Sequence, residues 1–385
     1  MLLSEIFPPH VGGSGRWLYE VYRRMPPGSV TACVAQHARG TEFDRQEHAW
    51  IERRPLSFEN WGIADPRGWR GYFTGYRVVS EAIRRLRPRE LHCGRCLPEG
   101  WLALMMQARF GLPFVCYVHG EELPMARQSR ELRWMTNRVL RRCRLLVANS
   151  YNTARMLREE WSVPDDKVRI LHPGVDTARF VPASASPGVR DKLGWSGAKV
   201  VFTVGRLQKR KGHDMLIRAL PAIRSQIPDV LYAIAGNGLE LETLKRLSAE
   251  TGVSDLVRFH GEVSDEQMIE CYQQCDLFAL PNREVDGDIE GFGMVLLEAQ
   301  ASGKPVIAGA SGGTRETMVV GETGLIVDCT RPEPLAEAVA QLLRDPGLRA
   351  TMGRDAREWV VANFEWTALA QQAGELFASY PAVSA

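Results

Sequence analysis

The sequence predicts an α/β protein of two domains, each a doubly wound parallel sheet with helices on both faces, and three observations predict it. At 385 residues, the chain is longer than one hydrophobic core usually organises. Short apolar runs rich in β-formers alternate with helical patterns, which is typical of parallel sheets. The alternation stops once, at 173–188, where Pro, Ser, Ala and Gly dominate, and then restarts. We interpret that stretch as a linker.

The first domain is expected at 1–182. After an N-terminal strand, its strands are predicted in SVTACVAQ, PFVCYVHG and RLLVANS, and its helices in GRWLYEVYRRM, GYRVVSEAIRRLR, TNRVLRRCR and NTARMLREEW. The second domain is expected at 183–363, with strands in KVVFTVG, VLYAIAG, VRFHG, LFALP and PVIAG. A C-terminal helix, within 364–385, is expected to cross back to the first domain. Because ligands of such sheets bind beyond the carboxyl ends of the strands, we expect a site in a cleft between the domains.

Composition places the chain among ordinary globular proteins, with 45% hydrophobic and 24% charged residues. No apolar run approaches the roughly 18 residues of a membrane span, and Glu5 interrupts the stretch where a signal peptide needs apolar residues. The eight cysteines are scattered and are interpreted as reduced thiols, so we expect a cytoplasmic protein. Cys93 and Cys96 form one C-x-x-C pair, which is weak evidence for zinc without a second pair.

Charge is divided unevenly between the two halves. Residues 1–182 hold 28 Lys and Arg against 19 Asp and Glu, so this half is expected to meet an anionic partner, though not a nucleic acid. The segment 127–144 carries seven arginines and one glutamate, with an apolar set of Leu132, Trp134, Met135, Val139 and Leu140. It is either a solvated helix that covers the sheet or a helix peripheral to anionic lipid at the inner face of a membrane. The uneven charge favours lipid.

A glycine-punctuated acidic loop leads into an apolar helix that carries Glu290 at its mouth and Glu298 further in. If the helix covers Gly291–Ser302, the glutamates lie about 12 Å apart along it. Paired glycosidase carboxylates lie roughly 5 to 9.5 Å apart, so these two suit the ends of one elongated ligand instead. Each carboxylate can bind a vicinal diol, which fits Glu298 to a ribose and Glu290 to a sugar.

Free amides at the start of that helix, those of Phe292, Gly293 and Met294, would bind a diphosphate between the two glutamates. The alternative is structural. In this alternative, Glu290 only caps the helix, and Glu298 is only a glutamate on the exposed surface of the helix. The spacing alone does not decide between these interpretations.

Two other stretches favour a phosphate ligand. Strand KVVFTVG is followed by RLQKRKG, where Arg206 and Lys211 could stabilise a departing diphosphate, unless the run is only a solvated basic turn. Near the N-terminus, FPPHVGGSG precedes a helix. Its Gly12 and Gly13 would let the backbone approach a phosphate closely, although a glycine cluster can also be a simple turn.

These stretches together resemble the retaining glycosyltransferases of family 4, which include bacterial mannosyl- and glucosyltransferases. The resemblance covers nearly the whole chain: FPP-x-x-GG, YVHGEE, ANS, HPGVDTARF, GRLQKRKG, AGNG, FHGEV and EGFGMVLLEAQASGKPVIAG. The two glutamates spaced E-x7-E around GFG are its most specific element. It implies the GT-B fold, in which two Rossmann-like domains face an interdomain cleft.

The resemblance also implies roles for individual residues. It assigns the donor diphosphate to Arg206 and Lys211, with Gly12 and Gly13 approaching from the other domain. It assigns the ribose to Glu298, and the sugar hydroxyls to Glu290 with the three amides named above. It further places Val263 near the base and His119 near the transferred sugar. Without the resemblance, His119 would be interpreted as structural, because a lone histidine at a strand end more often is.

The activity implied is transfer of a hexose, with retention, from GDP-mannose or a UDP-hexose to a hydroxyl of a lipid-linked or polysaccharide acceptor. The leaving phosphate itself takes the acceptor's proton, and no metal or other cofactor is expected, so Asp286-Gly287-Asp288 is interpreted as a loop. A small-molecule acceptor and a nucleotide-sugar epimerase remain alternatives. A non-catalytic binding protein is disfavoured because Lys211 and Glu290 are both present. A dinucleotide oxidoreductase is disfavoured because no G-x-G-x-x-G joins strand to helix.

Overall fold

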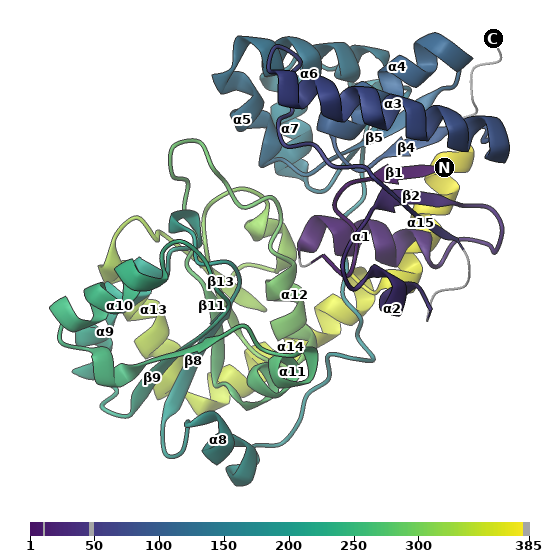
Figure 1. Ribbon diagram of the computed structural model, residues 1–385. Helices are drawn as coiled ribbons and strands as arrows, with labels where there is room; N and C mark the ends of the chain where they lie inside the picture. The colour runs from purple at the N-terminus through teal and green to yellow at the C-terminus, as the bar shows by residue number, and fades with distance from the viewer. Residues whose placement is uncertain (11, 46–49, 380–385) are drawn as a thin grey trace. The chain divides into compact units, whose positions relative to one another are not determined.

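Figure 1 shows the computed structural model of the protein, which describes residues 1–10, 12–45 and 50–379. Contacts divide the chain into two units. Unit 1 comprises Met1–Pro173 together with the C-terminal helix α15 (Trp366–Ser379), which packs on α1. Unit 2 comprises Gly174–Glu365.

The boundary that the sequence suggested, after residue 182, falls inside unit 2. Backbone contacts tie the preceding residues to that unit, because the Val175 N–H donates to Phe364 O at 2.8 Å. Phe180 is buried, with its ring edge-on to Tyr272 at 5.7 Å. The Pro- and Ser-rich composition therefore marked a linker, but not the residue at which the first unit ends.

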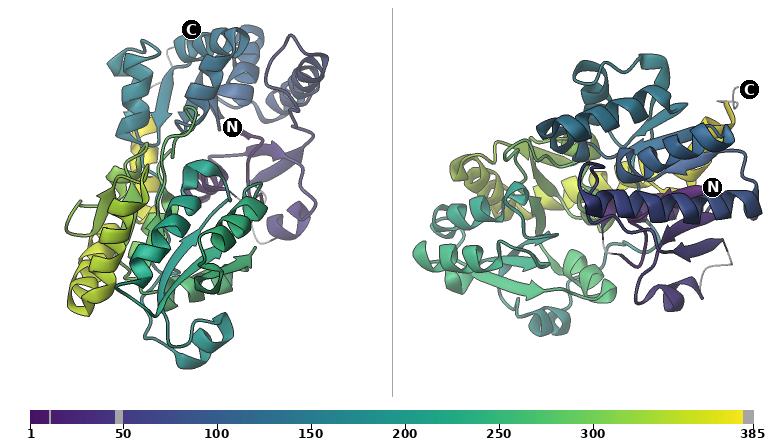
Figure 2. Two further views of the ribbon diagram at one scale, coloured as in Figure 1. Left: turned by 90° about the vertical axis from the view of Figure 1, so that its left-hand side faces the viewer. Right: turned by 45° about the horizontal axis from the view of Figure 1, so that its top comes forward.

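Unit 1 contains, in its described residues, a seven-stranded parallel sheet in the order β3-β2-β1-β4-β5-β6-β7. The strands are β1 (Leu2–Ser4), β2 (Ala32–Ala35), β3 (Ile51–Arg54), β4 (Leu91–Cys93), β5 (Phe114–Val118), β6 (Leu145–Ala148) and β7 (Val168–Ile170). Helices cover both faces of the sheet (Figure 2). They are α1 (Gly13–Tyr22), α2 (Gly40–Asp44), α3 (Pro66–Leu86), α4 (Trp101–Phe110), α5 (Glu122–Gln128), α6 (Arg130–Arg142), α7 (Tyr151–Glu159) and α15. All of β5 is buried, as expected for a strand covered on both sides.

Unit 2 contains a six-stranded parallel sheet in the order β10-β9-β8-β11-β12-β13 within the described part of the chain. Its strands are β8 (Lys199–Val204), β9 (Val230–Ala235), β10 (Val257–Gly261), β11 (Leu277–Leu280), β12 (Val306–Gly309) and β13 (Gly324–Val327). Its helices are α8 (Pro187–Leu193), α9 (His213–Arg224), α10 (Leu241–Glu250), α11 (Asp265–Gln274), α12 (Met294–Ala301), α13 (Pro332–Arg344) and α14 (Pro346–Asn363). The predicted α/β class, with two parallel-sheet units, is confirmed.

The two faces of the unit 2 sheet belong to two separate hydrophobic cores. Along β8, Val201 packs into one core and Phe202 into the other, as the two-residue period of a strand requires. The first core includes Leu220 and Val339, and the second includes Tyr272. Burial on both faces explains why the strand runs are almost continuously apolar.

The Arg-rich segment 127–144 forms two helices, because Ser129 ends α5 and caps α6, its Oγ accepting from the Leu132 N–H at 3.3 Å. Three apolar side chains of this segment are buried: Met135, Val139 and Leu140. Trp134 instead is 48% exposed. Most of the predicted apolar face therefore covers unit 1, while the exposed face is basic with one tryptophan.

All eight cysteines are buried and unpaired, and the thiols of Cys96 and Cys116 lie 3.8 Å apart. Burial raises the pKa of the Cys143 thiol to about 12. Within the residues that the structure describes, no helix has both the length and the apolar character needed to cross a membrane.

Gly353 allows α14 to pack closely against the end of α12. A Cβ at this position would lie 2.2 Å from Gly303 O, a backbone atom, so Gly353→Ala must push the two helices apart. We expect the free energy of unfolding in urea to fall by about 1–3 kcal/mol. The control is Gly188→Ala in α8, where a Cβ meets no atom within 4 Å. That variant should be as stable as the wild type or up to about 1 kcal/mol more stable. Equal free energies of unfolding for the two variants would contradict this packing.

Candidate functional site

The candidate site of unit 2 is built from loops that follow the carboxyl ends of β8, β10, β11 and β12. Two glycines with positive φ let these loops pack closely. At Gly212 (φ 75°) a Cβ would lie 1.7 Å from Pro281 O, and at Gly312 (φ 67°) a Cβ would lie 1.7 Å from Glu290 O. No larger residue fits either position. The β8 loop is therefore held against the β11 loop, and the β11 loop against the β12 loop.

Glu290 is the centre of a buried ion cluster. Its Oε2 accepts hydrogen bonds from Lys211 Nζ and Arg210 Nη1, both at 2.6 Å. Arg210 is buried too, and its Nε lies 3.1 Å from Asp288 Oδ2. Burial alone would raise the pKa of the Glu290 carboxyl, but the charges of Lys211 and Arg210 outweigh burial and hold that pKa below its usual value. The carboxylate is ionised at neutral pH and holds the ammonium of Lys211 in place.

The two predicted cations of this loop differ in their surroundings. Lys211 ends the 3₁₀ turn η3 (Lys209–Lys211) and points inward to Glu290. Arg206, which follows β8, is exposed, and its side chain makes no hydrogen bond or ion pair among the described residues. The second inward cation is Arg210, which the sequence did not single out. Successive residues of a 3₁₀ turn point about 120° apart, so a run of basic residues does not show which one turns inward.

Helix α12 begins later than the sequence suggested. The expected span Gly291–Ser302 is wrong at its start, because Gly293 caps the helix with φ 97° and the first helical residue is Met294. Phe292 precedes the helix, and its ring is buried 6.0 Å from that of Phe364. Of the three amides predicted to bind a diphosphate, only that of Met294 belongs to the first turn.

Glu298 lies inside α12 with only 4% of its surface exposed, and its Oε2 accepts a hydrogen bond from the Tyr272 hydroxyl at 2.7 Å. Glu298 is therefore not an exposed surface residue, as the purely structural interpretation of the sequence required. Tyr272 comes from α11, and nothing in the sequence linked it to Glu298. Val263, predicted to lie near the base, follows β10 and is half-buried against the core, at the same edge of the sheet.

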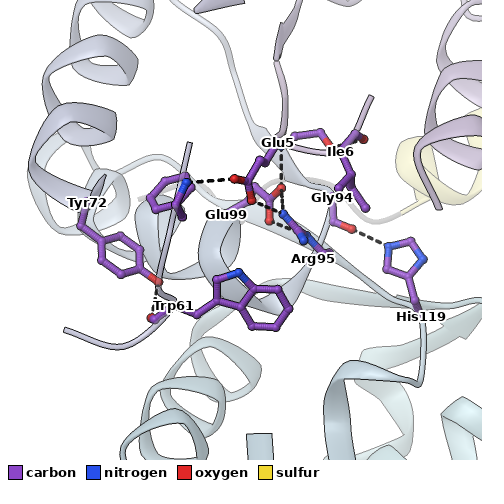
Figure 3. Close-up of polar contacts among 10 residues, drawn as sticks. Glu5, Ile6, Trp61, Tyr72, Gly94, Arg95, Glu99 and His119 are labelled. Carbon is purple, nitrogen blue, oxygen red and sulfur yellow. Dashed lines mark hydrogen bonds and ion pairs between the residues drawn. The ribbon is translucent and has the colours of Figure 1, made fainter. Parts of the chain in front are cut away.

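The predicted residues of unit 1 follow β1 and β5. Gly12 caps α1, and Gly13 is its first residue. His119, after β5, is buried, and its Nε2 lies 2.6 Å from Gly94 O (Figure 3). A carbonyl oxygen can only accept, so Nε2 carries the proton and donates. The His119 N–H donates to Glu122 Oε1 at 2.9 Å, which fixes the residue through its backbone as well.

A second ion cluster, which the sequence did not reveal, lies beside His119 in unit 1 (Figure 3). Arg95 Nη2 donates to Glu5 Oε2 at 2.7 Å and to Glu99 Oε1 at 3.1 Å. The guanidinium also lies over the Trp61 ring, 5.2 Å from its centre. Burial alone would lower the pKa of Arg95, but the carboxylates of Glu99 and Glu5 outweigh burial, so this pKa lies above its usual value. Arg95 is therefore a fixed cation next to the backbone that holds His119.

The segment Asp286-Gly287-Asp288 is a tight turn, as the sequence suggested. Asp286 and Gly287 have φ of 53° and 81°, and Val285 pairs with Asp288 across them. Asp288 is turned toward Arg210. Over the part of the chain that the structure describes, no group of three or more His, Cys, Asp or Glu residues is arranged to hold a metal ion.

Comparisons with known proteins agree with this architecture. A family model described as Glycosyltransferase Family 4 matches residues 11–179, and one described as Glycosyl transferases group 1 matches residues 188–359. The crystal structure of Anabaena HepE in complex with UDP superposes with a TM-score of 0.81 at 21% identity, covering 98% of this chain and 99% of that one. This likeness concerns the fold.

Two relatives carry the same name, GDP-mannose-dependent alpha-(1-6)-phosphatidylinositol monomannoside mannosyltransferase. That of Mycobacterium tuberculosis is 40% identical over 96% of this chain and 95% of its own length. That of Mycolicibacterium smegmatis is 42% identical over 55% of this chain and 56% of its own length. These matches confirm the resemblance seen in the motifs. The chain belongs to glycosyltransferase family 4, and its two parallel-sheet units have the GT-B fold.

Proposed function

We propose that this protein transfers a hexose, with retention of anomeric configuration and without a metal ion, from a nucleotide-diphosphate sugar to a hydroxyl group of a lipid-linked acceptor. GDP-mannose is the favoured donor because both relatives described above are named as GDP-mannose-dependent. They are also named for a phosphatidylinositol mannoside, which favours a lipid acceptor over a polysaccharide. The observation that carries the proposal is the Lys211 ammonium, fixed by Glu290 at the carboxyl edge of the unit 2 sheet.

Lys211 and Arg206 would stabilise the diphosphate as its charge develops. The bond from the anomeric carbon to the phosphate oxygen breaks, the acceptor oxygen bonds to that carbon from the same face, and the acceptor proton passes to the leaving phosphate. Because Glu290, which also accepts from Arg210, already holds Lys211, the charge of Lys211 needs no rearrangement during the reaction, which is how preorganised groups accelerate such steps. Lys211, held in this way, and the exposed Arg206 would supply the charge that a metal ion otherwise provides.

The two glutamates would bind the two ends of the donor. Both cations of the cluster bond Glu290 Oε2, and no hydrogen bond to Oε1 occurs within the described residues, so Oε1 can accept from sugar hydroxyls. Glu298, buried beside the Tyr272 hydroxyl, suits the ribose diol. Contacts of the donor with Gly12, Gly13 and His119 of unit 1, and of the base with the backbone near Val263, stay predictions.

We also propose that unit 1 contacts anionic lipid through the exposed face of α6. Trp134 projects there, and Arg138 lies over its ring at 5.4 Å. The other exposed arginines of this helix are Arg130, Arg133, Arg141 and Arg142. Arginine attracts anionic head groups, and a tryptophan beside it suits the boundary between water and lipid. This surface would keep the enzyme, expected to be cytoplasmic, near a lipid acceptor.

Lys211→Ala and Arg206→Ala should each lower turnover with GDP-mannose at least about a hundredfold, because each removes a charge that stabilises the departing diphosphate. Arg218→Ala, which removes an exposed arginine from α9, is the control and should retain wild-type turnover. Steady-state kinetics on folded variants measure this. Wild-type turnover in either the Lys211 or the Arg206 variant would refute the role of that residue.

The two glutamates should differ in nucleotide binding. Glu298→Gln should weaken the binding of free GDP, because a ribose partner is lost, whereas Glu290→Gln should retain GDP affinity and lose sugar transfer. Isothermal titration calorimetry with GDP and with GDP-mannose distinguishes the two variants. If both lost GDP affinity equally, the assignment of ribose and sugar to these residues would be wrong.

Replacing Arg138, Arg141 and Arg142 with Gln should weaken binding to phosphatidylglycerol liposomes by about 3 kcal/mol, since each basic contact contributes about 1 kcal/mol and their contributions are taken to add. Co-sedimentation at low and rising salt measures it, because salt screens such contacts. The control removes an equal charge from exposed sites of unit 2, at Arg218, Arg246 and Arg354. A membrane role for α6 would be contradicted if the two triple variants left the liposomes at the same salt concentration. It would also be contradicted if wild-type protein stayed in the supernatant at low salt.

A further inference from the structure

Tyr272 and Glu298 form a polar pair inside an otherwise apolar core of unit 2. Both residues are buried, and the tyrosine hydroxyl donates to Glu298 Oε2 at 2.7 Å. Residues next to Glu298 along α12, Leu297 and Ala299, are fully buried in this core. Burying a carboxyl group among apolar side chains costs free energy, and an apolar residue in its place would avoid that cost. The pair therefore calls for a role beyond packing.

Gln300, the other buried polar residue of α12, is explained by the fold alone. Its Nε2 donates to Leu296 O at 3.1 Å and to Thr317 O at 2.8 Å, so it satisfies backbone carbonyls. Glu298 instead accepts from a side-chain hydroxyl of α11, 26 positions away in the sequence. A contact of this kind fixes the direction of a carboxyl group rather than the path of the backbone.

Glu298 lies one turn inside the end of α12 that faces the candidate site. The helix begins at Met294, directly after the loop that carries Glu290 at the carboxyl edge of the sheet. Four residues of helix rise about 6 Å, so the carboxyl group of Glu298 belongs to the turn below the helix start. A ligand that lies across the start of α12 would meet it there.

The ring that carries the tyrosine hydroxyl is fixed on several sides. Its centre lies 5.7 Å from that of Phe180 and 5.5 Å from that of Phe202, both edge-on. Phe278 is tilted against it at 5.5 Å. Arg357 of α14 donates to Phe180 O at 2.9 Å and also to the carbonyl of the last residue of α12. One guanidinium thus anchors both the packing around the Tyr272 ring and the helix that carries Glu298.

A fixed donor restricts how the Glu298 carboxyl group can turn. A glutamate side chain has several rotatable bonds, and ordering them only when a ligand binds would cost entropy. A carboxylate has about four acceptor positions, and the tyrosine takes one of them. An acceptor that is oriented before binding holds a diol with a smaller entropic loss, which is the advantage of preorganisation.

We propose that Tyr272 is a positioning residue for the donor, whose hydroxyl orients Glu298 toward the two hydroxyls of the donor ribose. The proposal rests on the proposed function, because it needs a nucleotide-sugar whose ribose meets Glu298. Tyr272 acts through Glu298 and does not touch the ligand. Its loss should therefore affect only those nucleotides that carry ribose hydroxyls.

The probes are GDP and 2′,3′-dideoxy-GDP, which lacks both ribose hydroxyls, with binding measured by calorimetry. Tyr272→Phe keeps the buried ring and removes only the hydroxyl. It should weaken GDP binding about tenfold and leave the dideoxy nucleotide unchanged. The matched control is Tyr232→Phe, which removes an equally buried hydroxyl of unit 2 that donates to Thr203 Oγ1 at 3.2 Å. The control should keep the wild-type ratio of the two affinities.

Two further measurements separate positioning from a purely structural effect. With GDP-mannose, Tyr272→Phe should raise KM about tenfold and keep kcat within about twofold, because a ribose contact is made equally in the ground state and the transition state. In a Glu298→Ala background, adding Tyr272→Phe should not change the ratio of GDP affinity to dideoxy-GDP affinity, since the residue through which Tyr272 acts is gone.

A wild-type affinity ratio in Tyr272→Phe would overturn the positioning role, as would a further fall of that ratio in the Glu298→Ala background. Equal binding of the two nucleotides by wild-type protein would overturn it too, because no ribose hydroxyl would then be recognised. If the ratio depends on Tyr272 but wild-type protein transfers no hexose, the positioning role stands and the proposed transferase function is wrong.

Discussion

The buried contact between Glu290 and its two cations, Lys211 and Arg210, is the interaction on which the candidate donor site depends. It joins the loop after β8 to the loop after β11, and Gly312 lets the loop after β12 pack against Glu290 itself. Removing one partner from such a buried pair typically costs about 3–5 kcal/mol, because it leaves a charge uncompensated. The same contacts hold the Lys211 ammonium, which in the proposed reaction stabilises the departing diphosphate. One arrangement thus serves both the fold and the proposed chemistry.

Unit 1 has a similar ion cluster at the corresponding edge of its own sheet. Glu5 follows β1 and Arg95 follows β4, and these neighbouring strands bring the two together across 90 positions of sequence. A parallel sheet gathers the residues after its strands at one edge, where poorly hydrated charges must pair. Polar groups fixed in this way recognise hydroxyls and phosphates better than mobile side chains do, because less entropy is lost on binding.

The sequence predicted the order and class of most elements because their periodicity is strong, and the motifs indicated the loops in which the candidate residues lie. It could not predict where α12 begins, since that depends on the φ of Gly293. It could not predict that Arg210 turns inward, since that depends on the phase of one 3₁₀ turn. The ion cluster of Glu5 was missed for a different reason, because its partners come together only in the tertiary structure. Local patterns predict elements, whereas long-range pairing decides which polar side chains they bring together.

We propose that protein cations, rather than a metal ion, support transfer of a hexose with retention. The most direct measurement is proton NMR of the product formed from GDP-mannose and a phosphatidylinositol mannoside acceptor in the presence of EDTA. GDP-mannose carries its sugar in the α configuration, so we expect an α-linked product, formed at the same rate with and without EDTA. A β-linked product, or transfer that stops with EDTA and returns with Mg²⁺, would contradict it.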